Sequence, residues 1–261
     1  MKRFQLFELE DLSWFPSVLR DSMTRYIMIL HDVLGTTEKL LPIIEEIIEK
    51  SQATIIQDSC SGSGGPMLEV FGKLNESRVD STVELQLSDL YPNAKVVAEL
   101  NKNPIRGVSY QEEGVDVLEQ EFAKDSIQTM ICSFHHLPVE KARKVLSRAV
   151  EEQRSICIFE ITENAYPVWI WWLAFLPFWL MTFVLTLKIR PLRFSQIFFT
   201  YCIQILPICV AWDGAVSNGR TYTEGDLKEL TADLQQNYQW EIRQIKNRTP
   251  SNMLCLIGLP V

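Results

Sequence analysis

Short β-branched and apolar runs alternate with helical patterns between residues 53 and 161, and this alternation constrains the fold more than any other feature of the chain. Strands that alternate with helices indicate βαβ units and a parallel sheet. The five strand candidates in this stretch are residues 53–57, 82–87, 108–110, 126–133 and 155–161. A helix at residues 223–236 and a hairpin of residues 240–246 and 253–259 follow near the end of the chain. The sequence therefore predicts an α/β fold.

The length of 261 residues suits one large α/β domain that carries an insertion. Apolar residues at helical spacing between residues 15 and 50 predict two or three helices ahead of the first strand. We divide the chain into an N-terminal helical lid at residues 1–52, a Rossmann-like core at 53–164, an apolar insertion at 165–212, and a C-terminal helix and hairpin at 213–261 that complete the core.

Charge and cysteine usage exclude several classes of protein. The formal net charge of −8 removes the attraction to phosphate on which non-specific nucleic-acid binding depends, so we expect no nucleic-acid partner. The six cysteines lie mostly within apolar runs and none has Cys-x-x-Cys spacing, which indicates reduced thiols and no zinc site. The N-terminal residues turn acidic before a signal peptide could form, so we expect this end of the chain in the cytoplasm.

A turn of small residues follows the first strand candidate and precedes a helix that Pro66 would start well. The residues of the turn are Asp58, Ser59, Cys60, Ser61, Gly62, Ser63, Gly64 and Gly65. Glycines in such a turn let backbone N–H groups approach a ligand closely, and the N-terminus of the next helix favours anionic groups. A structural loop of small residues looks the same, so the turn alone is only moderately specific.

Polar residues also follow the next three strand candidates. Asp89 comes after the second strand, where a carboxylate can accept hydrogen bonds from two ribose hydroxyls. Asp116 lies past the third strand and could hold an adenine amino group, and Ser133 follows the fourth strand. Each acid alone is more often a solvated loop residue, but their recurrence at successive strand ends favours a nucleotide site at the carboxyl edge of the sheet.

The order of these motifs resembles that of class I S-adenosylmethionine-dependent methyltransferases. The resemblance covers residues 55–159 and rests on the glycine turn, the acids after the second and third strands and the segment 133–138, and the terminal hairpin fits it too. Residues 14–16 and 212–222 are further similar to a bacterial branch of that superfamily that carries an apolar C-terminal insertion. The resemblance implies a Rossmann-like, seven-stranded methyltransferase sheet with N-terminal helices and an inserted apolar helical segment, and S-adenosylmethionine as the cofactor.

The resemblance also implies cofactor-binding roles for particular residues. These are Asp58, Ser59, Cys60, Gly62, Gly64, Asp89, Asp116 and Ser133. Cys60 departs from the pattern, because the family usually has glycine there, and its side chain could narrow the methionine end of the pocket. Gly62 and Gly64 keep the two positions of closest approach.

His135 and His136 follow the fourth strand, at the sheet edge where ligands of open α/β folds bind. A histidine at this place can act as a general base, because its ordinary pKa suits neutral pH. Alternatively, one histidine packs under the cofactor and the other caps the next helix. Two adjacent histidines are expected to point different ways and to make a poor metal site, so we expect no metal.

Three residues are candidates for contact with the substrate. Trp14 could belong to a lid, as N-terminal segments do in many of these enzymes, or could anchor the first helix. Arg220 and Tyr222 follow the apolar insertion, on the side where the family builds its substrate pocket. Arg220 could bind a carboxylate or phosphate headgroup, or could pair with Asp213.

The apolar insertion is the most unusual part of the chain. Residues 165–187 and 194–212 are uncharged, and only the basic connector 188–193 separates them. The first run reaches the length of about 20 residues that crosses a bilayer, but a two-pass crossing would carry the basic connector to the far side and conflict with the positive-inside tendency. Five of the seven tryptophans lie here, a residue type that prefers the membrane interface.

These features predict a re-entrant or interfacial helical hairpin that associates with the cytoplasmic face of a membrane. The alternative is an internal cap that is buried on the core or in a homodimer. We expect methyl transfer from S-adenosylmethionine to an amphipathic or membrane-resident small molecule, such as a lipid or an isoprenoid or quinone-like compound. A non-catalytic, membrane-peripheral scaffold on the same fold is the second hypothesis. An NAD-dependent oxidoreductase is disfavoured, because the turn lacks the full Gly-x-Gly-x-x-Gly pattern.

Overall fold

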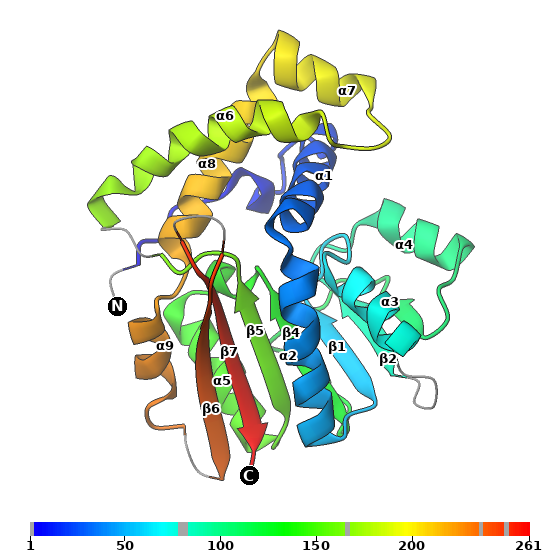
Figure 1. Ribbon diagram of the computed structural model, residues 1–261, viewed down its shortest axis with the longest axis vertical. Coiled ribbons are helices and arrows are strands. Elements are labelled where there is room, and N and C mark those ends of the chain that lie inside the picture. Colours follow the sequence, from blue (N-terminus) through cyan, green and yellow to red (C-terminus); the bar gives the residue numbers. More distant parts are fainter. Residues whose placement is uncertain (1–2, 78–82, 165–167, 235–236, 248–250) are drawn as a thin grey trace.

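The computed structural model describes residues 3–77, 83–164, 168–234, 237–247 and 251–261, and Figure 1 shows their arrangement. A twisted sheet flanked by helices forms the lower part of the molecule in this view. A separate group of helices stands above one end of the strands. The parallel strands run towards this group, so their carboxyl ends face it.

Seven strands form one sheet in the order β3-β2-β1-β4-β5-β7-β6. Their bounds are β1 Ile55–Ser59, β2 Glu84–Ser88, β3 Val108–Tyr110, β4 Ser126–Ile131, β5 Ser155–Glu160, β6 Tyr238–Ile245 and β7 Met253–Pro260. The first five strands run parallel, whereas β7 is antiparallel to both of its neighbours, β5 and β6. Every residue of β5 is buried, as expected for a parallel strand that helices cover on both faces.

Helices cover the two faces of the sheet. They are α2 (Thr36–Ser51), α3 (Met67–Ser77), α4 (Ala94–Lys102), α5 (Val139–Glu151) and α9 (Glu224–Thr231). Side chains of α2, α3 and α4 join Cys157 and Phe159 of β5 in one buried cluster. Side chains of α5 and α9 join Ile156 and Ile158 in a second cluster. Because successive strand residues point to opposite faces, the two clusters lie on opposite sides of the sheet.

The third group of helices lies beyond the carboxyl ends of the strands. It contains α1 (Ser17–Leu34), η3 (Val168–Ala174), α6 (Phe175–Thr186), α7 (Phe194–Ile197), η4 (Phe198–Cys202) and α8 (Ile205–Arg220). Two short helical turns lie with it: η1 (Leu9–Asp11) in the N-terminal segment and η2 (Phe134–His136) after β4. α6, α8 and α1 pack against one another. Met23 and Tyr26 of α1 meet Leu185, Leu206 and Val210 in a buried cluster that is separate from the two sheet clusters.

The predicted fold is confirmed: a seven-stranded, Rossmann-like α/β sheet with N-terminal helices and an inserted apolar helical segment. One predicted boundary lies elsewhere in the structure, because the insertion was expected to end at residue 212 and α8 continues to Arg220. The helix becomes polar at Asp213 because its neighbours change there: the Asp213 carboxylate accepts hydrogen bonds from the backbone of the N-terminal segment. The predicted residues 82, 165–167, 235–236 and 248–250 lie outside the described residues.

Candidate active site

The turn after β1 adopts the left-handed backbone that small residues permit. The φ angle is 59° at Cys60, 55° at Gly62 and 88° at Gly64. A Cβ at Gly64 would lie 2.4 Å from Leu68 Cδ1, whereas a Cβ at Gly62 would meet nothing within 4 Å. Gly64 is therefore required by the packing of the turn, and Gly62 borders the open space that a ligand needs to approach the backbone. Cys60 takes the conformation that a glycine would adopt more easily.

Side chains from two neighbouring strands hold this turn in place. The Tyr110 hydroxyl at the end of β3 donates a hydrogen bond to the Gly62 carbonyl oxygen at 2.7 Å. Asp89, directly after β2, accepts one from the Gly62 N–H at 2.8 Å and one from the Tyr91 N–H at 2.8 Å. A carboxylate offers about four acceptor positions, so the partly buried Asp89 keeps the capacity to bind a ligand hydroxyl.

Three carboxylates converge on Cys60. Burial raises the pKa of the Cys60 thiol, and the negative charges of Asp89, Asp58 and Asp116 raise it further. Burial also raises the pKa of Asp58 to about 7, although the Thr129 hydroxyl donates a hydrogen bond to it. The turn thus lies in a region of negative potential, which favours a positively charged ligand group.

Asp58 and Ser59 support the turn from within the sheet. Asp58 is only 3% exposed and accepts its hydrogen bond from Thr129 Oγ1 at 2.6 Å, and the buried Ser59 hydroxyl donates to Gln120 Oε1 at 2.8 Å. Both side chains point into the packed strands, and their expected role in cofactor binding stays a prediction. Their role in the structure is to fix the end of β1.

Asp116 and Ser133 occupy the places that the sequence suggested. Asp116 is partly exposed, and its Oδ1 accepts a hydrogen bond from the Leu118 N–H at 3.0 Å. The Ser133 hydroxyl is buried at the end of β4, and its interaction with the Cys60 thiol lowers the pKa of that thiol.

A cavity of about 590 Å³ lies beyond the carboxyl ends of β4 and β5. Cys132 and His135, which are close to Ser133 in the chain, line it at the end of β4. The apolar part of its lining comes from α1, η3, α6 and α8, and includes Met23, Tyr26, Ile27, Leu30, Ile170, Trp171, Ala174, Pro177, Phe178, Met181 and Val210. A second cavity, of about 380 Å³, lies at the opposite end, where Ser126 and Ser155 begin their strands. Because ligands of open α/β sheets bind at the carboxyl ends of the strands, the first cavity is the candidate site.

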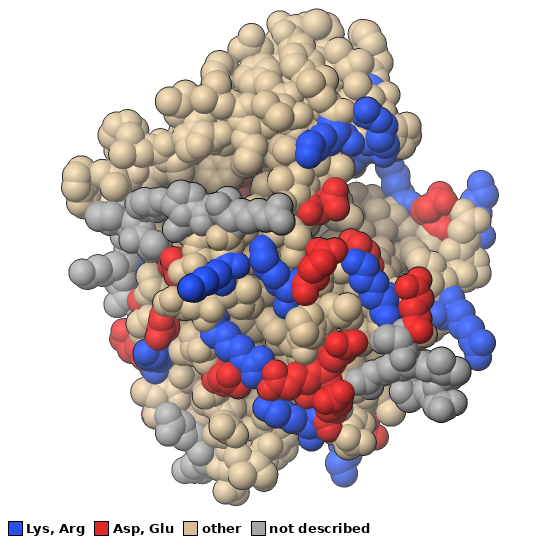
Figure 2. Space-filling model, viewed as in Figure 1, with Lys and Arg blue, Asp and Glu red and all other residues tan. Residues whose placement is uncertain are grey.

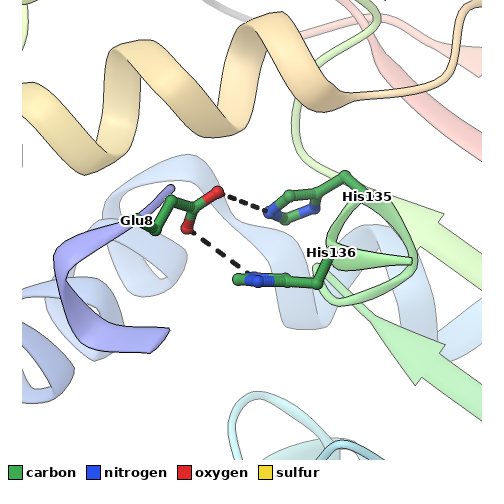
Figure 3. Close-up of side chains that lie close together, drawn as sticks. All are labelled: Glu8, His135 and His136. Carbon is green, nitrogen blue, oxygen red and sulfur yellow. Dashed lines mark ion pairs between the residues drawn. The ribbon is translucent and has the colours of Figure 1, made fainter. Parts of the chain in front are cut away.

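Both candidate histidines belong to η2, and both face Glu8 of the N-terminal segment (Figure 3). His135 Nδ1 lies 2.9 Å from Glu160 Oε2, and His136 Nδ1 lies 3.2 Å from Asp11 Oδ1. Their Nε2 atoms lie 3.8 and 3.7 Å from the two carboxylate oxygens of Glu8. The ring centroids are 4.3 Å apart. The expectation that the two side chains point different ways is therefore wrong, because the tight η2 turn brings both rings to the same side.

The cluster of Glu8, His135 and His136 has ligand atoms within 4.8 Å of one another, which is close enough for a metal ion. Arg220 Nη1, however, donates to Glu8 Oε1 at 2.9 Å. Its fixed positive charge opposes a cation at the same carboxylate. The expectation that the chain binds no metal here stays a prediction.

The carboxylates around His136 determine its protonation. Burial lowers the pKa of His136, but the carboxylates of Glu8 and Asp11 outweigh this effect and raise the pKa to about 9. In return, His136 and Arg220 hold the pKa of Asp11 well below its ordinary value despite its burial. His136 is therefore protonated at neutral pH and cannot accept a further proton, which leaves His135 as the candidate base.

The three residues expected to contact substrate do not line the cavity. Arg220 is 4% exposed and pairs with Glu8 and Asp11 instead of Asp213. Tyr222 is also buried, and its hydroxyl donates to the Leu137 carbonyl oxygen at 2.8 Å. Trp14 is 70% exposed. Arg220 and Tyr222 fix the N-terminal segment and η2, and the expected contact of these three residues with substrate stays a prediction.

Trp14 extends into solvent because its neighbour Phe15 fills the buried position beside α1. The element containing these two residues therefore anchors the first helix, as the alternative interpretation had it.

Two residues of the site were not identified from the sequence. Glu160 ends β5, and because it follows an apolar run at the same sheet edge as Ser133, its position was a usable signal. Glu8 lies 127 positions before His135 in a segment without regular pattern, and no motif relates the two. The Asp213 carboxylate brings Glu8 into place by accepting hydrogen bonds from the N–H groups of Leu9 at 2.7 Å and Glu10 at 3.1 Å.

No protein-family model and no curated protein sequence matches the chain. Solved structures do resemble it. The plantazolicin methyltransferase BamL, in complex with a triazolic desmethylPZN analog and SAH, has a TM-score of 0.52 and 11% identity over 94% of this chain and 98% of its own. The magnesium protoporphyrin IX methyltransferase ChlM from Synechocystis PCC 6803, with bound SAM, has a TM-score of 0.48 and 10% identity over 87% and 80%.

The chain spans only 43% of the length of two other similar structures, described as LepI in complex with SAM and as a pericyclic reaction enzyme, with TM-scores of 0.45 and 12% identity. At such identities the likeness concerns the fold. The strand order, the single antiparallel strand β7 and the similarity to BamL over nearly the whole of both chains agree with one another. The chain has the class I S-adenosylmethionine-dependent methyltransferase fold.

Proposed function

We propose that this protein transfers a methyl group from S-adenosylmethionine to an apolar or amphipathic small molecule. The observation that carries the proposal is the arrangement around Ser133. The glycine turn and Asp89 lie at the same sheet edge, and Cys132 and His135, close to Ser133 in the chain, line the apolar cavity. A cofactor at the turn and an acceptor in the cavity would meet at the end of β4.

The residues at the turn fit S-adenosylmethionine. Asp89 has acceptor positions left for ribose hydroxyls, and Asp116 is accessible for an adenine amino group. Gly62 has no side chain that would keep a ligand away from the turn. The negative potential that Cys60 experiences suits a sulfonium. When bound, S-adenosylmethionine supplies an electrophilic methyl group on that sulfonium.

His135 is the residue that we assign as general base. Glu160 Oε2, 2.9 Å from His135 Nδ1, accepts a hydrogen bond from the N–H of that nitrogen and favours the tautomer with a lone pair on Nε2, the nitrogen that faces Glu8 Oε1 at 3.8 Å. Nε2 can then take the proton of an acceptor hydroxyl as the oxygen becomes methylated, and Glu160 stabilises the imidazolium that forms. The Glu160 carboxylate also accepts a hydrogen bond from the His135 N–H at 3.1 Å, which fixes the backbone of the base.

The lining of the cavity indicates an acceptor with a long apolar part and a small polar group. Aliphatic and aromatic side chains form most of the wall. Among the polar residues of the wall, His135, His136 and Glu160 lie close together at the carboxyl ends of β4 and β5. A lipid, isoprenoid or quinone-like compound that carries a hydroxyl matches this distribution.

The proposal is tested by incubating the purified protein with S-adenosylmethionine labelled in its methyl group and with fractionated lipid extracts. We expect label to appear in an organic-soluble product that mass spectrometry identifies, and we expect the His135→Ala variant to form little of it. Cofactor binding without methylation of any fraction would favour a scaffold protein on the same fold.

A further inference from the structure

We propose that the outer face of η3, α6, α7 and η4 binds the surface of a bilayer that contains anionic lipids. We call this face the apolar cap. Binding to the bilayer does not require catalysis, but its consequence for the acceptor rests on the proposed function. Figure 2 shows the cap as a continuous surface at the top of the molecule with almost no charged side chains.

The helices of the cap are apolar on two opposite faces. On the outer face, Trp169, Leu176 and Val184 are 78%, 60% and 61% exposed. On the inner face, Ala174 and Met181 line the cavity. A helix that is apolar all round is either buried on every side or in contact with lipid. Because the outer face of α6 is exposed in the monomer, we assign it to lipid.

The size of the exposed surface supports the same conclusion. By length and composition, the helical stretch Trp169–Thr186 could cross a membrane. Contiguous exposed apolar surface is uncommon on soluble monomers, and where it is present it marks a contact with protein or membrane. Trp169 and Trp172 belong to the residue type that favours the headgroup region of a bilayer.

The charges around the cap select an anionic surface. Residues 165–212 contain no aspartate or glutamate, although the chain has 33 acidic residues in all. Lys188, Arg190 and Arg193 are exposed between α6 and α7, and Arg25 of α1 lies beside them, with its guanidinium bonded to Gln196 and Pro191. We call these four residues the basic rim, and Figure 2 shows lysine and arginine side chains at the border of the uncharged surface.

Each basic residue near an anionic membrane surface adds to the attraction between protein and bilayer. A second copy of the chain would present the same positive charge, so lipid complements the rim better than a homodimer does.

The packing of α6 determines the depth of insertion. Its inner face lines the cavity and packs on α8 and α1, so only the outer face is free to enter lipid. The pair α7–η4 and α8 is bent by 82° instead of forming a straight span. The cap therefore lies in the interface, where amphipathic helices enter about 5–10 Å, and does not cross the bilayer.

Trp171 of η3 and Phe178 of α6 line the cavity, and the outer faces of the same two helices meet the bound lipid, so an apolar acceptor could enter the cavity from the bilayer between them.

The test is flotation of the full-length protein with phosphatidylcholine vesicles, with and without phosphatidylglycerol. We expect the wild type to float with the anionic vesicles and to float less with the neutral ones. The variant W172S/L176S/L180S should lose binding at least about tenfold, because it removes three exposed apolar side chains from the outer face. The matched control V33S/I105S/V261S removes three exposed apolar side chains outside the cap and should bind as the wild type does.

A charge-reversal variant, K188E/R190E/R193E, should lose binding to the anionic vesicles specifically. Circular dichroism and thermal unfolding establish that each variant is folded, and quenching of tryptophan fluorescence by brominated lipids establishes insertion. A wild type that stays with the unbound fraction for both vesicle types overturns the proposal. A W172S/L176S/L180S variant that binds vesicles as tightly as the wild type also overturns it. The same holds if the wild type binds no vesicles but forms a dimer that the three substitutions dissociate. None of these measurements needs cofactor or turnover, so failure of methyl transfer would leave them interpretable.

Discussion

At the scale of single residues, the two halves of the site depend on carboxylates in different ways. Asp89 is partly buried, and within the described part of the chain it is bonded only to backbone N–H groups, so it keeps acceptor positions for a ligand. Glu160 is 5% exposed and is bonded to the ring and to the backbone N–H of His135. One acid is thus available to bind and the other to orient a neighbour.

Asp89→Ala should weaken binding of S-adenosylmethionine by about 1–3 kcal/mol, the cost of leaving ribose hydroxyls unpaired. Calorimetric titration of the wild type and the variant measures this difference. Because Asp89 also accepts from Gly62 N–H, Asp89→Asn, which keeps one acceptor oxygen, should lose less affinity than Asp89→Ala. Equal affinities in all three proteins would show that Asp89 does not contact the cofactor.

His135→Ala should lower turnover about 10²-fold or more while cofactor affinity changes little, because it removes the proposed base. Glu160→Gln should lower turnover less, since His135 stays but its tautomer is no longer fixed. Single-turnover assays with the identified acceptor measure both effects. If His136→Ala, and not His135→Ala, abolishes turnover, the assignment of the base is wrong.

Part of this residue-level site was predictable. Asp89, Gly62 and the histidines follow strand ends, and a strand end can be read from the sequence. The role of Glu8 could not be predicted, because it depends on the path of the N-terminal segment across η2 and α8. Which of His135 and His136 is the proposed base likewise depends on the carboxylate that each ring contacts, and the sequence does not predict these contacts.

At the scale of the elements, the glycine turn and the N-terminal segment carry the site. Strands and helices of the sheet were predictable, because they follow simple apolar periods. The continuation of α8 past residue 212 could not be predicted. The helix becomes polar there because it leaves its apolar helix neighbours and meets the backbone of η1.

Gly64→Ala should destabilise the protein by about 1–3 kcal/mol, because an alanine would adopt a φ of 88° and its Cβ would meet Leu68 at 2.4 Å. Gly72→Ala is the matched control. Gly72 lies within α3 at an ordinary helical φ, and a Cβ there meets nothing within 4 Å, so this variant should gain about 0.5–1 kcal/mol. Urea unfolding of the three proteins measures the differences, and a Gly64→Ala variant as stable as the wild type would contradict the geometry of the turn.

The docking of η1 on α8 should weaken as pH rises. Burial raises the pKa of Asp213 to about 8, and the carboxylates around His136 raise its pKa to about 9 despite burial. Both groups bind protons more tightly in the folded than in the unfolded state, so the folded state is favoured at low pH. The free energy of unfolding should therefore fall as pH rises through 8 and 9.

Chemical unfolding at several pH values between 6.5 and 9.5 measures this dependence. Asp213→Asn removes one of the titrating groups, so its stability should fall less steeply over this range than that of the wild type. A variant whose pH profile runs parallel to the wild-type profile would show that Asp213 does not titrate in this window.

At the scale of the whole molecule, three layers are arranged along one axis. The sheet provides the glycine-turn edge, the cavity lies beyond the carboxyl ends of its strands, and the apolar cap covers the cavity. The fold and the unusual apolar segment were both visible in the sequence. The cavity between them was not, because its walls come from α1, η3, α6 and α8, which are far apart along the chain.

The central claim is that the glycine-turn edge binds S-adenosylmethionine. Calorimetric titration of the purified wild-type protein with S-adenosylmethionine tests this claim most directly. Thermal unfolding in the same buffer is a second measurement of binding. We predict saturable binding at one site per chain. At a free ligand concentration 100-fold above Kd, it should stabilise the folded state by about 2.7 kcal/mol. A titration without heat of binding, together with an unfolding temperature that millimolar S-adenosylmethionine leaves unchanged, would contradict the claim.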